Sequence, residues 1–157
     1  MNLDMDIKVA VSDKKFDGNI REVLTINEAT LSDEFVKQPS LFAWFATLAE
    51  FANAEVESRK LSLSVLRANL DSEKRAELAK DGKVTEGMVD SAITKDKRHL
   101  VANEELIEAS RQAGILKALV RALEQRSTML VQLGSLKRQE LFLSDFGVDI
   151  KKVRENH

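Results

Sequence analysis

The stretch that decides the fold is residues 40–80, which read SLFAWFATLAEFANAEVESRKLSLSVLRANLDSEKRAELAK. It contains no glycine and no proline, the two residues that most often interrupt a helix. A single helix of about 40 residues would span about 60 Å, too long for a compact domain of this size. The stretch therefore predicts a long helix that needs another helix beside it.

Apolar residues recur at heptad spacing in this stretch, as they do in helices that pack side by side. One core position of the heptad holds Phe42, Ala49, Val56, Leu63 and Leu70, and the other holds Phe45, Ala52, Arg59 and Leu66. A second periodic segment places Leu106, Ala113 and Val120 at one position and Ala109, Leu116, Leu123 and Leu130 at the other. The two segments are expected to fold back as an antiparallel pair.

Helix-ending and helix-starting residues predict how the two helices are joined. Asp81-Gly82 should end the first helix, and Thr85 should cap a short helix that reaches about Ile93. Residues 95–99 then lead into the second long helix, and residues 144–147 predict its end.

Proline and glycine predict two further features. Residues 30–34 offer a helix start, but that short helix must stop by Gln38, because the residue before Pro39 disfavours helical backbone. Gly114 and Gly134, inside the second long helix, predict a close helix crossing or a bend at one of them.

The two ends of the chain differ from its centre. Residues 7–11 and 20–26 carry β-branched residues on either side of a turn-like segment at 16–19, so a hairpin and an irregular arm both fit. Residues 148–157 predict a short strand or a frayed arm. The expected organisation is an N-terminal arm or β-hairpin at 1–27, a helical domain at 28–143 and a tail at 144–157. The fold class is mainly α, a long helical hairpin with coiled-coil-like packing.

Composition excludes several classes of protein. The 157 residues carry a net charge of −2, so a basic coat over the whole chain is excluded, and any nucleic-acid site must be local. The chain has no cysteine and two histidines, which argues against a thiolate or histidine metal site. It begins without a signal peptide and has no membrane-length apolar run, so we expect a cytoplasmic protein, in the host cytoplasm if a phage encodes it.

No arrangement of residues indicates catalysis, a metal site or a cofactor. The isolated glycines lack the lysine and hydroxyl of a phosphate-binding loop. His99 is expected in a solvated capping role, and the acids at residues 104–108 are expected to complement the dipole of the helix that they begin. A non-enzymatic protein is therefore expected.

Charge is distributed unevenly along the chain. Residues 1–57 hold 11 acids and 5 bases, whereas residues 111–138 hold 6 bases and one acid. A cationic helix face can neutralise nucleic-acid phosphates, although such a face is often only solvated or paired with acids of a neighbouring helix. The candidate DNA contacts are Arg67, Arg111, Lys117, Arg121, Arg126, Lys137 and Arg138.

Large apolar residues cluster at the start of the first long helix. Aromatic side chains there could stack bases, but their helical clustering favours a core or a subunit interface. Because one subunit can hardly bury all of them, we expect a homo-oligomer whose interface is formed by Leu41, Phe42, Trp44, Phe45, Leu48 and Phe51.

Three stretches together resemble phage recombination mediators of the UvsY type. They are residues 42–50 leading into 66–71, the spacer 84–90, and residues 118–134, which follow one another in the family's order. The resemblance implies a helical subunit that forms a ring-like oligomer, binds single-stranded DNA and loads a RecA-type recombinase onto strands covered by single-strand-binding protein. The family's basic pair falls on residues 66–70, where Arg67 matches and Asn69 is neutral.

Two hypotheses follow for the function. The first is a recombination mediator with salt-sensitive, largely sequence-independent binding of single strands. The second is a structural or adaptor protein, such as a phage scaffold or virion component, that assembles through its long helices and need not bind DNA.

Overall fold

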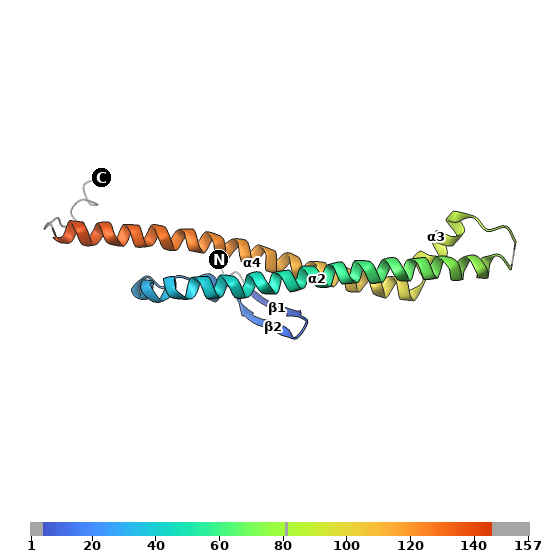
Figure 1. Ribbon diagram of the computed structural model, residues 1–157, viewed down its shortest axis with the longest axis horizontal. Helices are drawn as coiled ribbons and strands as arrows, with labels where there is room; N and C mark the ends of the chain where they lie inside the picture. The colour runs from blue at the N-terminus through green and yellow to red at the C-terminus, as the bar shows by residue number, and fades with distance from the viewer. Residues whose placement is uncertain (1–4, 81, 146–157) are drawn as a thin grey trace. The chain divides into compact units, whose positions relative to one another are not determined.

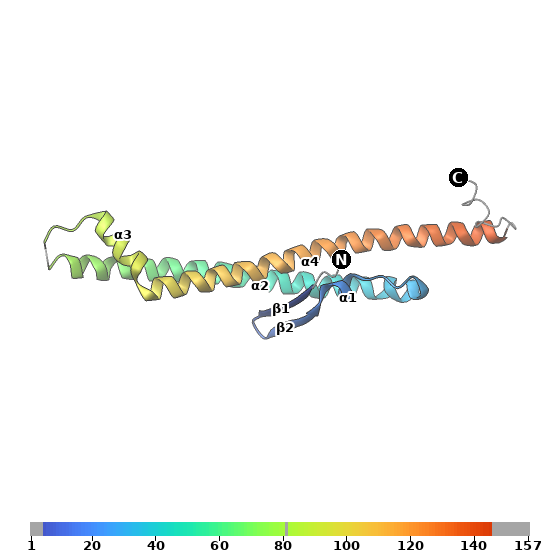
Figure 2. The ribbon, with the colours of Figure 1, turned by 180° about the vertical axis from the view of Figure 1, so that it is seen from behind.

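The computed structural model describes residues 5–80 and 82–145 and is mainly helical (Figure 1). The elements are β1 (Asp6–Val11), β2 (Lys14–Asn19), α1 (Ile20–Leu24), the 3-10 helix η1 (Glu28–Thr30), α2 (Leu31–Leu78), α3 (Glu86–Lys95) and α4 (Lys97–Asp145). β1 and β2 form a two-stranded antiparallel hairpin. Segments of α2 and α4 lie side by side and run in opposite directions, as the view from behind also shows (Figure 2). The predicted helical hairpin is confirmed.

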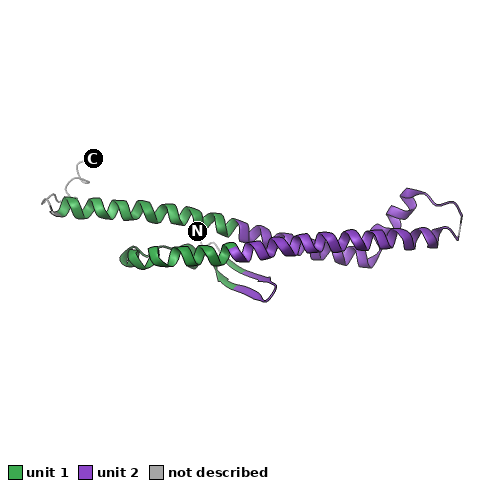
Figure 3. Cartoon of the chain, in the orientation of Figure 1, with its two compact units in different colours: residues 1–7, 17–46, 118–157 green, residues 8–16, 47–117 purple. Residues whose placement is uncertain are grey.

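The chain divides into two compact units (Figure 3). Unit 1 comprises residues 1–7, 17–46 and 118–157, and unit 2 comprises residues 8–16 and 47–117. Each unit holds a segment of α2 packed against a segment of α4, so each has its own core. No helix in the described part of the chain combines the length and apolar composition needed to cross a bilayer.

Unit 2 is built on the predicted heptad positions. Ala49, Ala52, Ala113 and Leu116 of the two seams are all buried. Beyond them, Leu70 of α2 packs with Val89 and Ile93 of α3 in a small apolar cluster. The small residues of the seam allow α2 and α4 to approach closely, and α3 covers the leucine at the end of the pair.

The connection between α2 and α4 has two of the local signals that the sequence predicts, Gly82 and Thr85, and the third, Asp81, lies outside the described residues. Gly82 has φ 135°, a backbone conformation that other residues rarely adopt, so the chain can turn there. The Thr85 side chain accepts a hydrogen bond from the backbone N–H of Met88 and caps α3. The predicted cap and short helix are confirmed.

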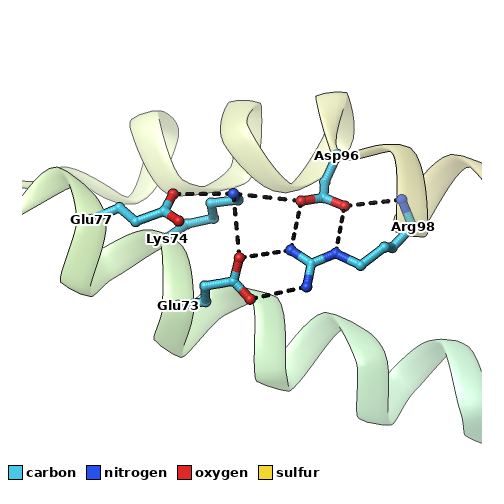
Figure 4. Close-up of polar contacts among 5 residues, drawn as sticks. All are labelled: Glu73, Lys74, Glu77, Asp96 and Arg98. Atoms are coloured by element: carbon cyan, nitrogen blue, oxygen red, sulfur yellow. Dashed lines mark hydrogen bonds and ion pairs between the residues drawn. The ribbon is translucent and has the colours of Figure 1, made fainter.

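A polar cluster in unit 2 fixes the start of α4 (Figure 4). Asp96 accepts a hydrogen bond from the backbone N–H of Arg98 at 2.9 Å, which caps the helix. The Arg98 guanidinium also binds the carboxylates of Asp96 and Glu73, and Lys74 lies 3.5 Å from Asp96 and 3.1 Å from Glu77. Hydrogen bonds from Arg98 hold the pKa of Asp96 and that of Glu73 below their usual values.

The N-terminal hairpin differs in register from the sequence prediction. Residues 14–19 form the second strand, not the turn, and the chain reverses at residues 12 and 13, where Ser12 has φ 56°. Residues 20–24 are helical rather than extended, because the Asn19 side chain accepts a hydrogen bond from the Arg21 backbone N–H at 2.9 Å. An asparagine that looks like a turn residue is here a helix cap.

The helix at residues 30–38 does not stop before Pro39. α2 runs from Leu31 to Leu78 with Pro39 inside it, so the predicted break is wrong. Proline removes one backbone hydrogen bond and costs about 3 kcal/mol in a helix interior. In unit 1 the residues before it, Glu34 and Gln38, are buried and bonded to α4, and this tertiary contact offsets the local cost.

The two glycines of α4 have different surroundings. A Cβ built on Gly134 would lie 3.0 Å from Cζ of Phe35, so the close helix approach predicted from sequence is found here, in unit 1. A Cβ on Gly114 would have nothing within 4 Å. α4 ends at Asp145, and the rest of the predicted stop signal and the tail at 148–157 lie outside the described residues.

Candidate nucleic-acid interface

Arg126, predicted as a DNA contact, lies inside unit 1 with only 6% of its surface exposed. Its guanidinium forms an ion pair with Glu34, donates a hydrogen bond to Gln38 Oε1, and lies 3.3 Å from the Thr25 carbonyl oxygen. Gln38 in turn donates to the Leu123 carbonyl at 2.8 Å. Arg126 is therefore not part of an exposed basic stripe, contrary to the sequence prediction. It is buried, and a buried carboxylate of α2 neutralises its charge.

Arg67 and Arg111 are exposed but carry acidic partners in unit 2. Arg67 lies 2.9 Å from Asp90 of α3, and Arg111 lies 2.6 Å from Glu108 one turn earlier on α4. The Arg111 hydrogen bond, with a second one from Gln112, lowers the pKa of Glu108 to about 2. Exposed pairs of this kind are weak, so a phosphate group could compete for either guanidinium.

Lys117 and Arg121 are the exposed candidates whose charge is not compensated. Lys117 belongs to unit 2 and Arg121 to unit 1, and both side chains are exposed on α4. Among the described residues neither forms an ion pair or a hydrogen bond through its side chain. These two cations can therefore accept a phosphate without first breaking an internal pair.

Lys137 and Arg138 lie near the end of α4 in unit 1. Lys137 is 3.9 Å from Glu140, and Arg138 donates to Ser135 Oγ at 3.2 Å. Both line a groove of about 470 Å³ with residues of η1 and the first residues of α2, and the acids Glu28 of η1 and Asp33 of α2 also line it. The groove is of mixed charge, so it does not form a cationic site by itself.

The predicted interface residues separate into buried and exposed side chains. Phe45 in unit 1 and Leu48 in unit 2 are each 1% exposed, so they belong to the core of the protomer and are not available to another subunit. Leu41 and Phe42 are half-buried in unit 1. Trp44 and Phe51 remain exposed at 41% and 44%.

Exposed apolar side chains in the last turns of α4 were not predicted from sequence. Six such residues in unit 1 are Met129, Val131, Leu136, Leu141, Phe142 and Leu143. Most lie outside the heptad seam of the second periodic segment, whereas the sequence predicts an interface only at the start of the first long helix. The sequence signal for this exposed apolar surface was the presence of large apolar residues outside the seam.

The remaining acids and the histidine considered from sequence lie in unit 2. A groove of about 610 Å³ in unit 2 contains four glutamates, but Arg59 lies between two of them, 2.7 Å from Glu55 and 2.6 Å from Glu105. The described chain has no cluster of three or more histidine, cysteine or acidic residues suited to hold a metal ion. His99 is half-buried on the first turn of α4, beside the Asn103 amide.

Comparisons with protein-family models, with curated proteins and with solved structures gave no match to this chain.

Proposed function

We propose that the protein is a recombination mediator that binds single-stranded DNA as a ring-like oligomer. In this role it promotes loading of a RecA-type recombinase onto strands covered by single-strand-binding protein. The observation that carries the proposal is the pair of uncompensated exposed cations Lys117 and Arg121 on α4, in a chain whose stretches resemble UvsY-type mediators. The resemblance implies a helical subunit, and the described part of the chain is mainly helical.

Phosphate contacts should dominate the binding. Lys117 and Arg121 are exposed cations, and electrostatic contacts to phosphates carry no sequence information. Binding of this kind releases counterions, so the affinity should fall steeply as salt is added. A net charge of −2 makes each subunit a weak binder, and an oligomer would gain affinity by presenting several such sites to one strand.

The exposed apolar side chains of α4 support the assembly that the proposal needs. Phe142 is 62% exposed, Val131 59% and Leu141 58%. Large apolar side chains gathered on one segment of a surface are typical of protein interfaces. Contact with a second copy would remove them from water.

The proposal is tested by fluorescence anisotropy of a labelled oligo-dT and of a duplex of equal length, at low and at physiological salt. Light scattering on the same samples reports the oligomer. We expect an oligomer that prefers the single strand and weakens with salt. A protein that binds neither nucleic acid at low salt, or a monomer at micromolar concentration, would contradict the proposal.

Matched variants connect this binding to the two cations. Lys117→Gln should weaken oligo-dT binding, whereas Lys60→Gln removes the same charge from an exposed lysine of unit 2 that already lies 2.8 Å from Glu57. The control should therefore have the smaller effect. Arg121→Gln gives the same comparison for arginine, with Arg75→Gln as its control, because the Arg75 guanidinium is already bound to the carboxylates of Asp71 and Glu86.

The alternative function is a self-assembling structural or adaptor protein, such as a scaffold or virion component. It is favoured by the internal pairing of three predicted DNA contacts, since Arg67, Arg111 and Arg126 all have carboxylate partners. An oligomer that binds neither oligo-dT nor the duplex at either salt concentration would support this alternative.

A further inference from the structure

One cleft of unit 1 combines an aromatic wall with a cation. It has a volume of about 650 Å³ and lies along α2, between the residues that follow β2 and the side of the helix. Its lining includes Val36, Lys37, Ser40, Leu41 and Trp44 of α2, with Glu22, Val23 and Thr25 from the preceding segment. Arg126 and Glu34 also line it.

Trp44 is held in place and is still open to solvent. Its ring meets Phe45 edge to face, with 4.6 Å between the ring centroids, and Phe45 is almost fully buried. The indole is nevertheless 41% exposed. A large aromatic side chain that is fixed on one side and exposed on another is the arrangement on which a nucleic-acid base stacks.

Lys37 supplies a cation two helical turns before this ring. The spacing of Lys37, Ser40 and Trp44 is i, i+3 and i+7, which places them along one face of α2. Lys37 is exposed, and its ammonium group has no ion pair or hydrogen bond within the described ranges. The face thus offers, in order, a free positive charge, a hydroxyl group and an aromatic surface.

The remaining charges of the cleft leave Lys37 as its effective cation. Glu34 is compensated by its buried ion pair with Arg126, so the two together add no net charge. Glu22 of α1 is exposed and forms no ion pair among the described residues, so its carboxylate opposes the approach of a phosphate. Removal of that carboxylate should therefore strengthen binding of an anion.

We propose that this cleft takes one nucleotide of a single DNA strand, with its base stacked on Trp44 and its phosphate on Lys37. The inference rests on the proposed function and adds a base contact to the phosphate contacts of α4. Single strands suit the cleft because their bases are free to leave the stack, whereas a duplex keeps its bases paired. Stacking accepts every base, so the contact preserves sequence-independent binding.

The chain offers a direct probe of this contact, because Trp44 is its one tryptophan and it has no tyrosine. Tryptophan emission of the full-length protein is therefore the emission of Trp44. We expect oligo-dT to quench it, and an abasic oligonucleotide of the same length to bind more weakly and to quench less. The pairing of these two ligands separates base stacking from phosphate attraction.

Substitutions give the expected size of each contact. Trp44→Leu should weaken oligo-dT binding by about 5- to 150-fold, because a base–aromatic contact has this range, and Trp44→Phe should retain part of the affinity. Lys37→Gln should lower the slope of log affinity against log salt by about 0.7, as expected for one lost phosphate contact. Glu22→Gln should tighten binding. Circular dichroism of each variant checks that it is folded.

The outcomes separate the inference from the function on which it rests. If oligo-dT binds by anisotropy but Trp44 emission does not change and Trp44→Leu binds like the natural protein, the cleft inference fails and the mediator proposal stands. Emission that changes with protein concentration and not with DNA would assign Trp44 to a contact between copies, which also overturns the inference. Absence of oligo-dT binding at low salt would refute both.

Discussion

Replacement of Arg126 by methionine should destabilise the protein strongly, although the side chain is a cation on a helix rich in exposed charges. Methionine is about as long as the aliphatic stem of arginine, so it retains the apolar contacts of that stem. The substitution removes the cation that pairs with Glu34, a residue only 8% exposed. It also removes the donor of the hydrogen bond to Gln38 Oε1. A carboxylate and an amide oxygen are then left in the interior without compensation.

The expected loss is about 3–5 kcal/mol, the range for removal of one partner of a buried ion pair. Urea unfolding followed by circular dichroism measures it. With a denaturant slope of about 2 kcal/mol per M, the midpoint should fall by about 2 M. Arg121→Met, on an exposed face of the same helix, is the matched control and should leave the midpoint almost unchanged.

A double variant separates the buried charge from the packing of the site. Glu34→Leu with Arg126→Met removes both charges together, so its stability should recover to near or above that of the natural protein. The reasoning would be refuted by Arg126→Met unfolding at the natural midpoint. It would also be refuted by a double variant that loses as much as the sum of both single changes.

Three further predictions concern stability. Hydrogen bonds from Arg98 lower the pKa of Asp96, so this carboxyl binds a proton less readily in the folded protein than in the unfolded chain. Its contribution to stability is therefore complete above the unfolded pKa of about 3.9 and is lost as the pH falls below that value. The urea midpoint should therefore drop between about pH 5 and about pH 2, and drop less in Asp96→Asn. Gly114→Ala should raise stability by up to about 1 kcal/mol, and Gly134→Ala by less, because its Cβ would lie 3.0 Å from the Phe35 ring; thermal unfolding that ranks the two in the opposite order would contradict this. Pro39→Ala restores a helical N–H and should stabilise the protein by up to about 3 kcal/mol; a thermal midpoint that does not rise would contradict this.

The features that the sequence predicted correctly depend on local signals. Helical periodicity over residues 40–80 and the cap at Thr85 involve residues within a few turns of one another. The same holds for the end of α2 near Gly82, where backbone conformation alone restricts the residue. Such signals can be read without knowledge of the partner helix.

The features that were missed depend on residues far apart in the chain. Helix α2 continues through Pro39 because two residues before it are bonded to α4. Gln38 is bonded to Leu123, which is 85 positions away, and Glu34 to Arg126, which is 92 positions away. Arg126 looked like a surface cation beside the seam, and nothing near it in the sequence shows that an acid of α2 reaches it. The sequence signal for a buried partner of Arg126 was the pair Glu34 and Gln38, two polar residues one helical turn apart on α2.

The candidate site divides in the same way. Arg121 lies outside the predicted seam of α4 and is exposed, as helical periodicity alone leads one to expect. It could not show which exposed cations have acidic partners, since the Arg67 partner belongs to a different helix. Nor could it show that Trp44 lines a cleft, which requires the segment between β2 and α2 to pack beside it.

The most direct test of the central claim is the salt dependence of oligo-dT binding by the natural protein and by the Lys117→Gln, Arg121→Gln double variant. Each phosphate contact on a single strand contributes about 0.7 to the slope of log affinity against log salt. We expect a steep slope for the natural protein and a slope smaller by about 1.4 for the variant. Equal slopes would show that α4 does not contact the strand, and no binding by the natural protein at low salt would contradict the mediator function itself.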